Sequence, residues 1–257
     1  MGSKPLFRAL SLDLGETVWW DTPEHGVRHD ATRVRILSES LVGPDGRTVE
    51  PEKVAGAWNA LRAELRAAGR SPRTLSTPDK IDELARRTGS HFTLPREAVT
   101  DRFAFAGLDT DPPTVTSEAV QLVTQLNHWG VPGVAISNTQ RTGEAWRRFL
   151  GSRGMRFEFV ITSSDREYSK PDPRLFREAS ERLSLPFAEI LHIGDRWETD
   201  VVGALSVGMG AALYRGLWSR HWDRDEGIAT DPGTHPEVAR WDDLTLAEDC
   251  FTEHRPA

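Results

Sequence analysis

The chain has 257 residues, with 32 Lys and Arg against 39 Asp and Glu, and a formal net charge of −7 at pH 7. Its 38% of hydrophobic residues is typical of a globular protein with a buried core, and its acidic balance argues against nucleic acid as a partner. No apolar run is long enough to cross a membrane, and the single cysteine, Cys250, excludes an intrachain disulfide and a cysteine-ligated zinc site. Because the first residues lack the apolar stretch of a signal peptide, we expect a cytoplasmic protein.

The first predicted strand is the short apolar run Ala9–Leu12. After it, residues 21–111 have a different pattern, with helical rather than alternating periodicity. One amphipathic helix is predicted from the apolar stripe formed by Val54, Trp58, Leu61 and Leu65. Another is predicted to begin at Thr77, as an N-cap, with Pro78 in the first helical position. Since no convincing strand occurs here, we expect this insertion to be all-helical.

From residue 112 onward, short apolar runs alternate with helical patterns. The predicted strands are residues 134–136, 159–161, 190–193 and 211–214, and the predicted helices lie near 145–150, 173–183 and 199–207. Short apolar strands between helices are typical of a parallel sheet covered on both faces. The sequence therefore predicts an α/β fold, in which residues 1–20 and 112–257 form a doubly wound parallel sheet and residues 21–111 form a cap inserted after the first strand.

Polar residues follow several of these strands, where ligands bind in open parallel sheets. The clusters are Asp13 with Glu16, Ser137 with Asn138, Lys170 within Ser-Lys-Pro-Asp-Pro, and Asp195 followed by Asp200. Paired carboxylates favour a hard cation such as Mg²⁺, whereas a lysine, a hydroxyl and backbone N–H groups suit anionic oxygens. An attacking carboxylate, a metal ion and donors around developing charge together indicate a site for phosphoryl transfer.

In order and spacing, these clusters resemble the four motifs of the haloacid dehalogenase superfamily, over residues 7–20 and about 112–215. The resemblance implies a Rossmann-like core with a cap inserted just after the first motif. It implies that Asp13 is the nucleophile, and that Ser137 and Lys170 bind phosphate, with the backbone N–H of Asn138. It also implies an Mg²⁺ site formed by Asp13, the carbonyl of Gly15, Asp195 and Asp200.

The first motif departs from that of the family's phosphatases. They usually have Asp-x-Asp-Gly-Thr, in which the second Asp is the general acid and base, whereas this chain has Gly15 at that position and Glu16 after it. A positioned acid or base contributes roughly 10²–10⁴ in rate, so a phosphatase with this motif would take its proton from elsewhere. Glu16, His25 and His29 are candidates, and a substrate with a good leaving group would lessen the need. A solvent-facing Glu16 without a catalytic role is an equal alternative.

The favoured interpretation is an Mg²⁺-dependent phosphatase that acts on a small phosphorylated metabolite through an aspartyl-phosphate at Asp13. A dehalogenase also lacks the second Asp, although Asp195 and Asp200 resemble a magnesium-type fourth motif. A phosphonate hydrolase would need a cap lysine, for which the insertion offers only Lys53 and Lys80. The last alternative is a catalytically impaired binding or regulatory protein. We expect no nucleic-acid or membrane partner, and a monomer or homodimer.

Aromatic and basic residues offer further binding candidates. Trp19 and Trp20 follow the first motif at the entrance to the insertion, where they either stack on a substrate or pack the hinge. Three other tryptophans fit amphipathic patterns and are predicted to be core residues: Trp58, Trp129 and Trp146. The insertion also holds arginines that either bind a substrate anion or form a solvated helix face: Arg62, Arg66, Arg70 and Arg73.

Overall fold

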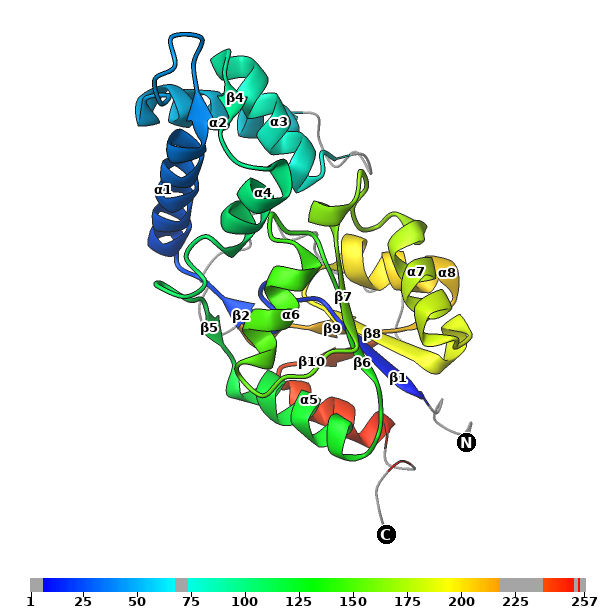
Figure 1. The fold of residues 1–257 in the computed structure, drawn as a ribbon. Coiled ribbons are helices and arrows are strands. Elements are labelled where there is room, and N and C mark those ends of the chain that lie inside the picture. Colours follow the sequence, from blue (N-terminus) through cyan, green and yellow to red (C-terminus); the bar gives the residue numbers. More distant parts are fainter. Residues whose placement is uncertain (1–6, 68–73, 218–237, 252–253, 255–257) are drawn as a thin grey trace.

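The computed structural model describes residues 7–67, 74–217, 238–251 and 254, and its centre is a six-stranded sheet (Figure 1). In spatial order the strands are β10 (Ala239–Trp241), β9 (Gly210–Tyr214), β8 (Ile190–Gly194), β1 (Ala9–Leu12), β6 (Gly133–Ser137) and β7 (Phe159–Thr162). All neighbouring strands pair in parallel. The predicted strands are confirmed with ends within a residue of those expected, and β10 is an additional strand.

Helices cover both faces of the sheet, as predicted for a doubly wound fold. They are α5 (Ser117–His128), α6 (Gly143–Gly151), α7 (Pro173–Leu183) and α8 (Gly203–Val207). Leu10 and Leu12 of β1 belong to one buried cluster with residues of α5 and α6, whereas Ala9 belongs to another with residues of α7 and α8. This alternation follows from the two-residue period of a strand, which sends successive side chains to opposite faces. The helix predicted near 199–207 is divided, with a π-helical turn at Trp197–Val202 before α8.

The insertion is built from helices that share a core of their own. They are α1 (Pro23–Ser40), α2 (Pro51–Ala67), α3 (Thr77–Thr88) and α4 (Arg96–Phe105). The stripe predicted on α2 is buried at Val54, Trp58 and Leu61 and partly buried at Leu65. In Figure 1 these helices lie together beyond one edge of the sheet. The expected helical insertion is therefore present.

Two local expectations for the insertion need correction. A short antiparallel pair, β3 (Leu41–Val42) with β4 (His91–Phe92), joins the helices. Strands of two residues are too short to show the alternation by which a strand is predicted from sequence. The N-cap of α3 is Ser76, whose hydroxyl accepts a hydrogen bond from the backbone N–H of Asp79, and not Thr77.

A second short pair, β2 (Trp19–Trp20) with β5 (Thr114–Val115), lies where the chain passes between the sheet and the inserted helices. The predicted boundaries at residues 20 and 112 fall at or beside these strands. That the two parts are separate domains stays a prediction. Among the described helices, none combines the length and apolar character needed to cross a membrane.

Candidate active site

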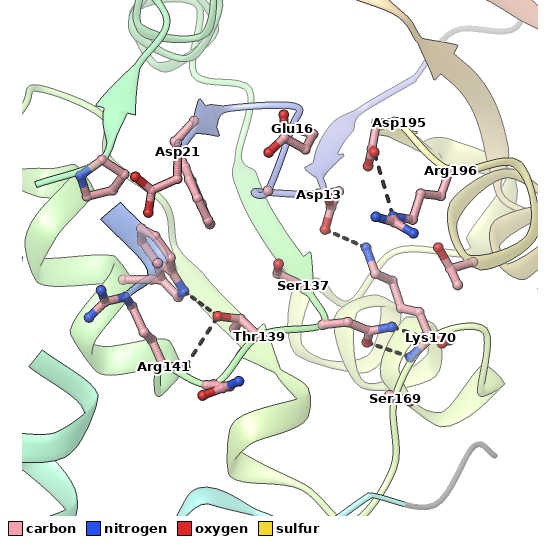
Figure 2. A pocket seen from close by; sticks show the side chains of 18 of the residues that line it. Asp13, Glu16, Asp21, Ser137, Thr139, Arg141, Ser169, Lys170, Asp195 and Arg196 are labelled. Atoms are coloured by element: carbon pink, nitrogen blue, oxygen red, sulfur yellow. Dashed lines mark hydrogen bonds and ion pairs between the residues drawn. The ribbon is translucent and has the colours of Figure 1, made fainter. Parts of the chain in front are cut away.

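The site begins with a buried ion pair between Asp13, directly after β1, and Lys170, in the loop before α7 (Figure 2). Lys170 Nζ lies 2.7 Å from Asp13 Oδ1 and 2.5 Å from Asp200 Oδ1. Burial raises the pKa of Asp13, an effect that the Lys170 cation partly opposes. Burial alone would lower the pKa of Lys170, but the two carboxylates raise it above the usual lysine value. Lys170 is therefore a fixed positive charge beside Asp13.

Asp200 is the second carboxylate that accepts a hydrogen bond from Lys170, and it is itself held in position. Its Oδ2 accepts a hydrogen bond of 2.9 Å from the backbone N–H of Arg196. Burial would raise its pKa, but Lys170 and His192 lower it well below the usual aspartate value. The Asp200 side chain lies so close to the end of β8 that position 194 requires a glycine: a Cβ on Gly194 would lie 2.4 Å from Asp200 Cγ. Asp200 therefore stays ionised and orients Lys170.

Three buried carboxylates lie close enough to share a cation. Asp13, Asp195 and Asp200 each offer one oxygen, and these oxygens lie within 4.8 Å of one another. Carboxylate oxygens suit a hard divalent ion. Asp200 accepts hydrogen bonds from Lys170 and Arg196, and Asp13 accepts one from Lys170. The cluster fits the predicted type of metal site without specifying the ion.

The predicted phosphate-binding residues lie at the end of β6. Ser137 is 2% exposed and lines the same cavity as Asp13 and Lys170. The side chain of Asn138 contacts the backbone of Lys170 in both directions: its Nδ2 donates to Lys170 O at 2.9 Å, and its Oδ1 accepts from Lys170 N at 2.8 Å. This amide therefore anchors the loop that carries Lys170. Its backbone N–H as a phosphate ligand stays a prediction.

A cavity of about 780 Å³ lies above this end of the sheet, between the sheet and the inserted helices. The predicted site residues that line it are Asp13, Gly15, Glu16, Trp19, Ser137, Asn138, Lys170, Asp195 and Asp200. Trp20 does not line it, and packs against the main core instead. The tertiary structure thus brings together almost the whole predicted set.

The tryptophans at the hinge have different positions. Trp19 stacks on Trp146, with ring centroids 5.0 Å apart, and both rings line the cavity. The sequence leaves hinge packing and substrate contact as alternatives for Trp19. Its position is compatible with both. Trp58 and Trp146 are core residues as predicted, and Trp129 is partly buried against the core.

The proton-transfer candidates also differ. Glu16 lines the cavity in a left-handed backbone conformation, with φ of 57°. His29 lines it too, but both ring nitrogens are engaged, with Arg141 Nη2 at 3.2 Å from Nδ1 and Asp111 O at 2.6 Å from Nε2. A guanidinium only donates, so Nδ1 accepts and Nε2–H donates in a neutral ring, whose pKa burial lowers. Both ring nitrogens of His29 are therefore already bonded within the protein.

His25 does not line the cavity. Its Nδ1 lies 2.7 Å from Asp21 Oδ1, and its Nε2 lies 3.1 Å from Asp111 Oδ1. This ring therefore bridges two acidic side chains near the points where the chain enters and leaves the inserted helices. It fits a hinge contact better than a proton carrier.

Sequence patterns do not reveal several other residues of the cavity, among them Asp21, Asp30, Arg33 and Arg141. Arg141 is 4% exposed and donates to the carbonyl oxygens of Ala104 and Ala106 at 2.9 and 2.7 Å. These residues are isolated in sequence and belong to no motif, so only tertiary structure brings them to the site.

Of the four arginines predicted either to bind a substrate anion or to form a solvated helix face, Arg62 is the one whose side chain the structure describes. Arg62 lines the cavity. Arg70, Arg73 and the side chain of Arg66 lie outside the described residues. The interpretation as a wholly solvated helix face therefore does not hold for Arg62.

Sequence relatives include phosphatases. The chain is 40% identical over 95 residues to the 5-amino-6-(5-phospho-D-ribitylamino)uracil phosphatase YigB of Escherichia coli (strain K12), an alignment that spans 36% of this chain and 38% of that protein. It is 36% identical over 59 residues to a glyceraldehyde 3-phosphate phosphatase of Pyrococcus abyssi, over 23% of this chain and 25% of that protein. The matched segments thus span well under half of either relative.

Solved structures with the same fold include a 2-haloacid dehalogenase from Pseudomonas syringae, with a TM-score of 0.57, 20% identity, and coverage of 97% of this chain and 100% of that one. A phosphatase from Thermococcus onnurineus has a TM-score of 0.56 and 20% identity, over 95% of this chain and 97% of that one. These likenesses show the fold alone. The model of a family described as haloacid dehalogenase-like hydrolase matches residues 3–208, a range that includes all four motifs. The chain therefore belongs to the haloacid dehalogenase-like hydrolase family.

Proposed function

We propose that this hydrolase is an Mg²⁺-dependent phosphatase that removes phosphate from a small molecule through an aspartyl-phosphate on Asp13. The observation that carries the proposal is the buried arrangement of Lys170 2.7 Å from Asp13, beside the carboxylate cluster of Asp13, Asp195 and Asp200. A fixed cation and a metal site next to a carboxylate suit the charge that develops in phosphoryl transfer. The phosphatases among the relatives agree with this choice.

In the first half of the reaction, a carboxylate oxygen of Asp13 attacks phosphorus as the bond to the leaving-group oxygen breaks. Lys170 and Ser137 bind the oxygens of the transferring phosphoryl group, and Asp200 keeps the lysine charged and oriented. Asp13, Asp195 and the Gly15 carbonyl would hold Mg²⁺, which when bound offsets negative charge on those oxygens. In the second half, water attacks phosphorus and the bond to the Asp13 oxygen breaks, which releases phosphate and restores the carboxylate. The proton that the water loses returns to the acid that protonated the leaving group.

The leaving-group oxygen needs a proton, and position 15 has no side chain to supply it. Glu16 is the proposed source, because it lines the cavity three residues beyond the nucleophile. A substrate whose alcohol leaves easily as an anion would depend less on this proton.

Dehalogenation is the second candidate, and Gly15 is the observation that favours it. The carboxylate cluster favours the phosphatase, since displacement of halide by Asp13 has no use for a divalent cation. Phosphonate hydrolysis has weaker support, because neither lysine of the insertion, Lys53 or Lys80, lines the cavity.

The test is phosphate release from a panel of phosphorylated metabolites, with Mg²⁺ and with chelator, by the wild type and Asp13→Asn. We expect metal-dependent release that the variant loses, with circular dichroism unchanged. The control is Asp82→Asn, which removes a half-exposed carboxylate of α3 that pairs with Arg96 at 3.0 Å. Full activity of Asp13→Asn would overturn the mechanism. Halide release from 2-haloacids without phosphate release would support the dehalogenase, and silence in both assays would favour a binding protein.

A further inference from the structure

The cavity has a second charged wall, away from the Asp13–Lys170 pair. It includes Arg33 from α1, Arg62 from α2 and Arg141 from the segment between β6 and α6, and we refer to these three residues as the arginine wall. In the view of Figure 2, Arg141 lies on the opposite side of the cavity from Lys170. A ligand that fills the cavity would therefore meet positive charge at both ends.

The arginine wall is only partly neutralised by its hydrogen-bonded neighbours. Asp30 accepts from Arg33 Nη1 at 3.0 Å and also pairs with Arg62 Nη1, so one carboxylate serves two guanidinium groups. Arg141 donates to two backbone carbonyls and to the neutral ring of His29. Asp21 contributes a negative charge nearby, but it lies closest to His25. The wall thus has more guanidinium groups than carboxylates bonded to them.

Arg33 has unused hydrogen-bonding capacity in addition to its charge. Its side chain is 9% exposed, and its buried Nε has no hydrogen-bond acceptor in the part of the chain that the structure describes. The guanidinium lies over the ring of Phe103, 5.5 Å from the centroid. A buried donor without a partner is unfavourable. This arginine is therefore poorly satisfied by the protein alone.

Repulsion among the three arginines of the wall also makes the binding of an anion favourable. Burial lowers the pKa of Arg141, as does the neighbouring Arg33. Burial also lowers the pKa of Arg33, with Arg62 contributing. Guanidinium groups stay protonated at neutral pH, so these effects leave uncompensated positive charge instead of removing it. An anion at the wall would relieve both the repulsion and the loss of hydration.

We propose that Arg33, Arg62 and Arg141 bind a second anionic group of the substrate, so that the enzyme acts on phosphorylated molecules that also carry a carboxylate or another phosphate. Both groups present oxyanions, for which arginine's planar array of donors is well suited. The volume of about 780 Å³ exceeds what one phosphoryl group needs, leaving room for a molecule that spans the two walls. This inference rests on the proposed function for the group bound at Asp13.

The test compares substrates that differ only at the far end. Glycerol 3-phosphate has no second anion, 3-phosphoglycerate has a carboxylate in place of the far hydroxymethyl group, and glycerol 1,3-bisphosphate has a phosphate on it. We expect kcat/KM to be roughly tenfold to a hundredfold higher for at least one two-anion substrate, the range for one or two charge-assisted hydrogen bonds. Which of the two gains more identifies the anion.

Arg62→Gln is the main variant, since Arg62 is the most exposed of the three arginines and its replacement is the safest for folding. It should lower the ratio of kcat/KM between two-anion and one-anion substrates by roughly tenfold, mainly through KM. The control is Arg35→Gln on α1, the helix that carries Arg33, because the Arg35 side chain pairs with Glu39 at 2.9 Å and does not line the cavity. It should leave the ratio unchanged. Arg33→Lys should retain more of the preference than Arg33→Gln.

Binding to Asp13→Asn separates this inference from the phosphatase proposal. The shift in Tm caused by glycerol 1,3-bisphosphate should be larger than that caused by glycerol 3-phosphate, and the difference should shrink in Asp13→Asn/Arg62→Gln. If substrates are hydrolysed without preference and Arg62→Gln leaves the ratio intact, the arginine wall is not a substrate site, although the phosphatase stands. If nothing is hydrolysed but binding depends on Arg62 in this way, the anion site stands and the phosphatase proposal fails.

Discussion

A Cβ atom on Gly15 would lie 3.6 Å from Cζ2 of Trp19, at ordinary van der Waals distance. The backbone of Gly15 is also outside the positive-φ region that favours glycine. The position of the family's second aspartate is therefore open to a side chain, and its absence here is a difference in chemistry rather than a requirement of the fold. Trp19 lies beside the space that this side chain would occupy.

We expect Gly15→Asp to raise phosphatase activity, because it adds a carboxylate next to Asp13 that can protonate the leaving group. Because Glu16 is the proposed proton source in the wild type, the increase in kcat for alkyl phosphates should stay below the roughly 10²–10⁴ that one positioned acid contributes. It should be smaller still for aryl phosphates, whose leaving groups need less help. The measurement is kcat for both substrate types. Gly15→Asn, which has the same shape without the acid, should give no increase. An equal gain from both variants would show that the effect is not proton transfer.

Glu16→Gln should have the opposite effect if Glu16 supplies the proton in the wild type. The loss in kcat should be roughly 10²–10⁴ for alkyl phosphates, and distinctly less for aryl phosphates. Glu198→Gln is a matched control, since Glu198 also lines the cavity but belongs to the π-helical turn after β8. If Glu16→Gln leaves both rates unaltered, Glu16 is a structural residue of the turn.

Gly194→Ala should remove most of the activity, because the new methyl group would lie 2.4 Å from Asp200 Cγ and force that carboxylate away from Lys170. We expect overpacking to reduce the free energy of unfolding by about 1–3 kcal/mol. Urea unfolding and phosphate release measure the two effects. Gly56→Ala, in α2 with open space around it, should leave activity intact and not destabilise the protein. Normal activity in Gly194→Ala would contradict the role assigned to Asp200.

Lys80 should destabilise the inserted helices at neutral pH. It is 6% exposed, and burial together with the nearby Arg33 lowers its pKa from 10.5 to about 8. Below pH 8 the lysine is charged in both states, so the full penalty applies. Between about 8 and 10.5 the folded protein binds fewer protons than the unfolded chain, so stability rises with pH. We expect Lys80→Met to raise the free energy of unfolding by about 2–3 kcal/mol at pH 7.

The gain from Lys80→Met should become smaller at pH 9.5, where the folded wild type has lost this charge. Urea unfolding at both pH values measures it. Lys53→Met is the control, because Lys53 Nζ donates to Thr88 O at 2.7 Å and its removal should not stabilise the protein. An equal gain at the two pH values would show that the stabilisation comes from packing and not from charge.

Local sequence determined much of this molecule. Five of the six strands of the sheet could be predicted because apolar runs such as Ala9–Leu12 are buried on both faces, and the stripe on α2 follows helical periodicity. Asp13, Ser137, Lys170 and Asp195 could be predicted as a group because each lies at the carboxyl end of a strand or in the loop that follows it. The carboxyl ends of parallel strands meet at one edge, so strand order was not needed to bring these side chains together.

Tertiary structure alone decided the rest. The pairing of β3 with β4 comes from backbone groups of residues some fifty positions apart, in strands too short to produce a pattern. Asn138 holds the Lys170 loop through a contact between distant loops, and His29 Nδ1 accepts a hydrogen bond from Arg141, which lies far along the chain. Single arginines carry no periodic signal in sequence. The sequence by itself therefore determined the residues at the sheet end of the cavity, where the strand ends converge, whereas the folding of α1 and α2 over the sheet decided what faces them.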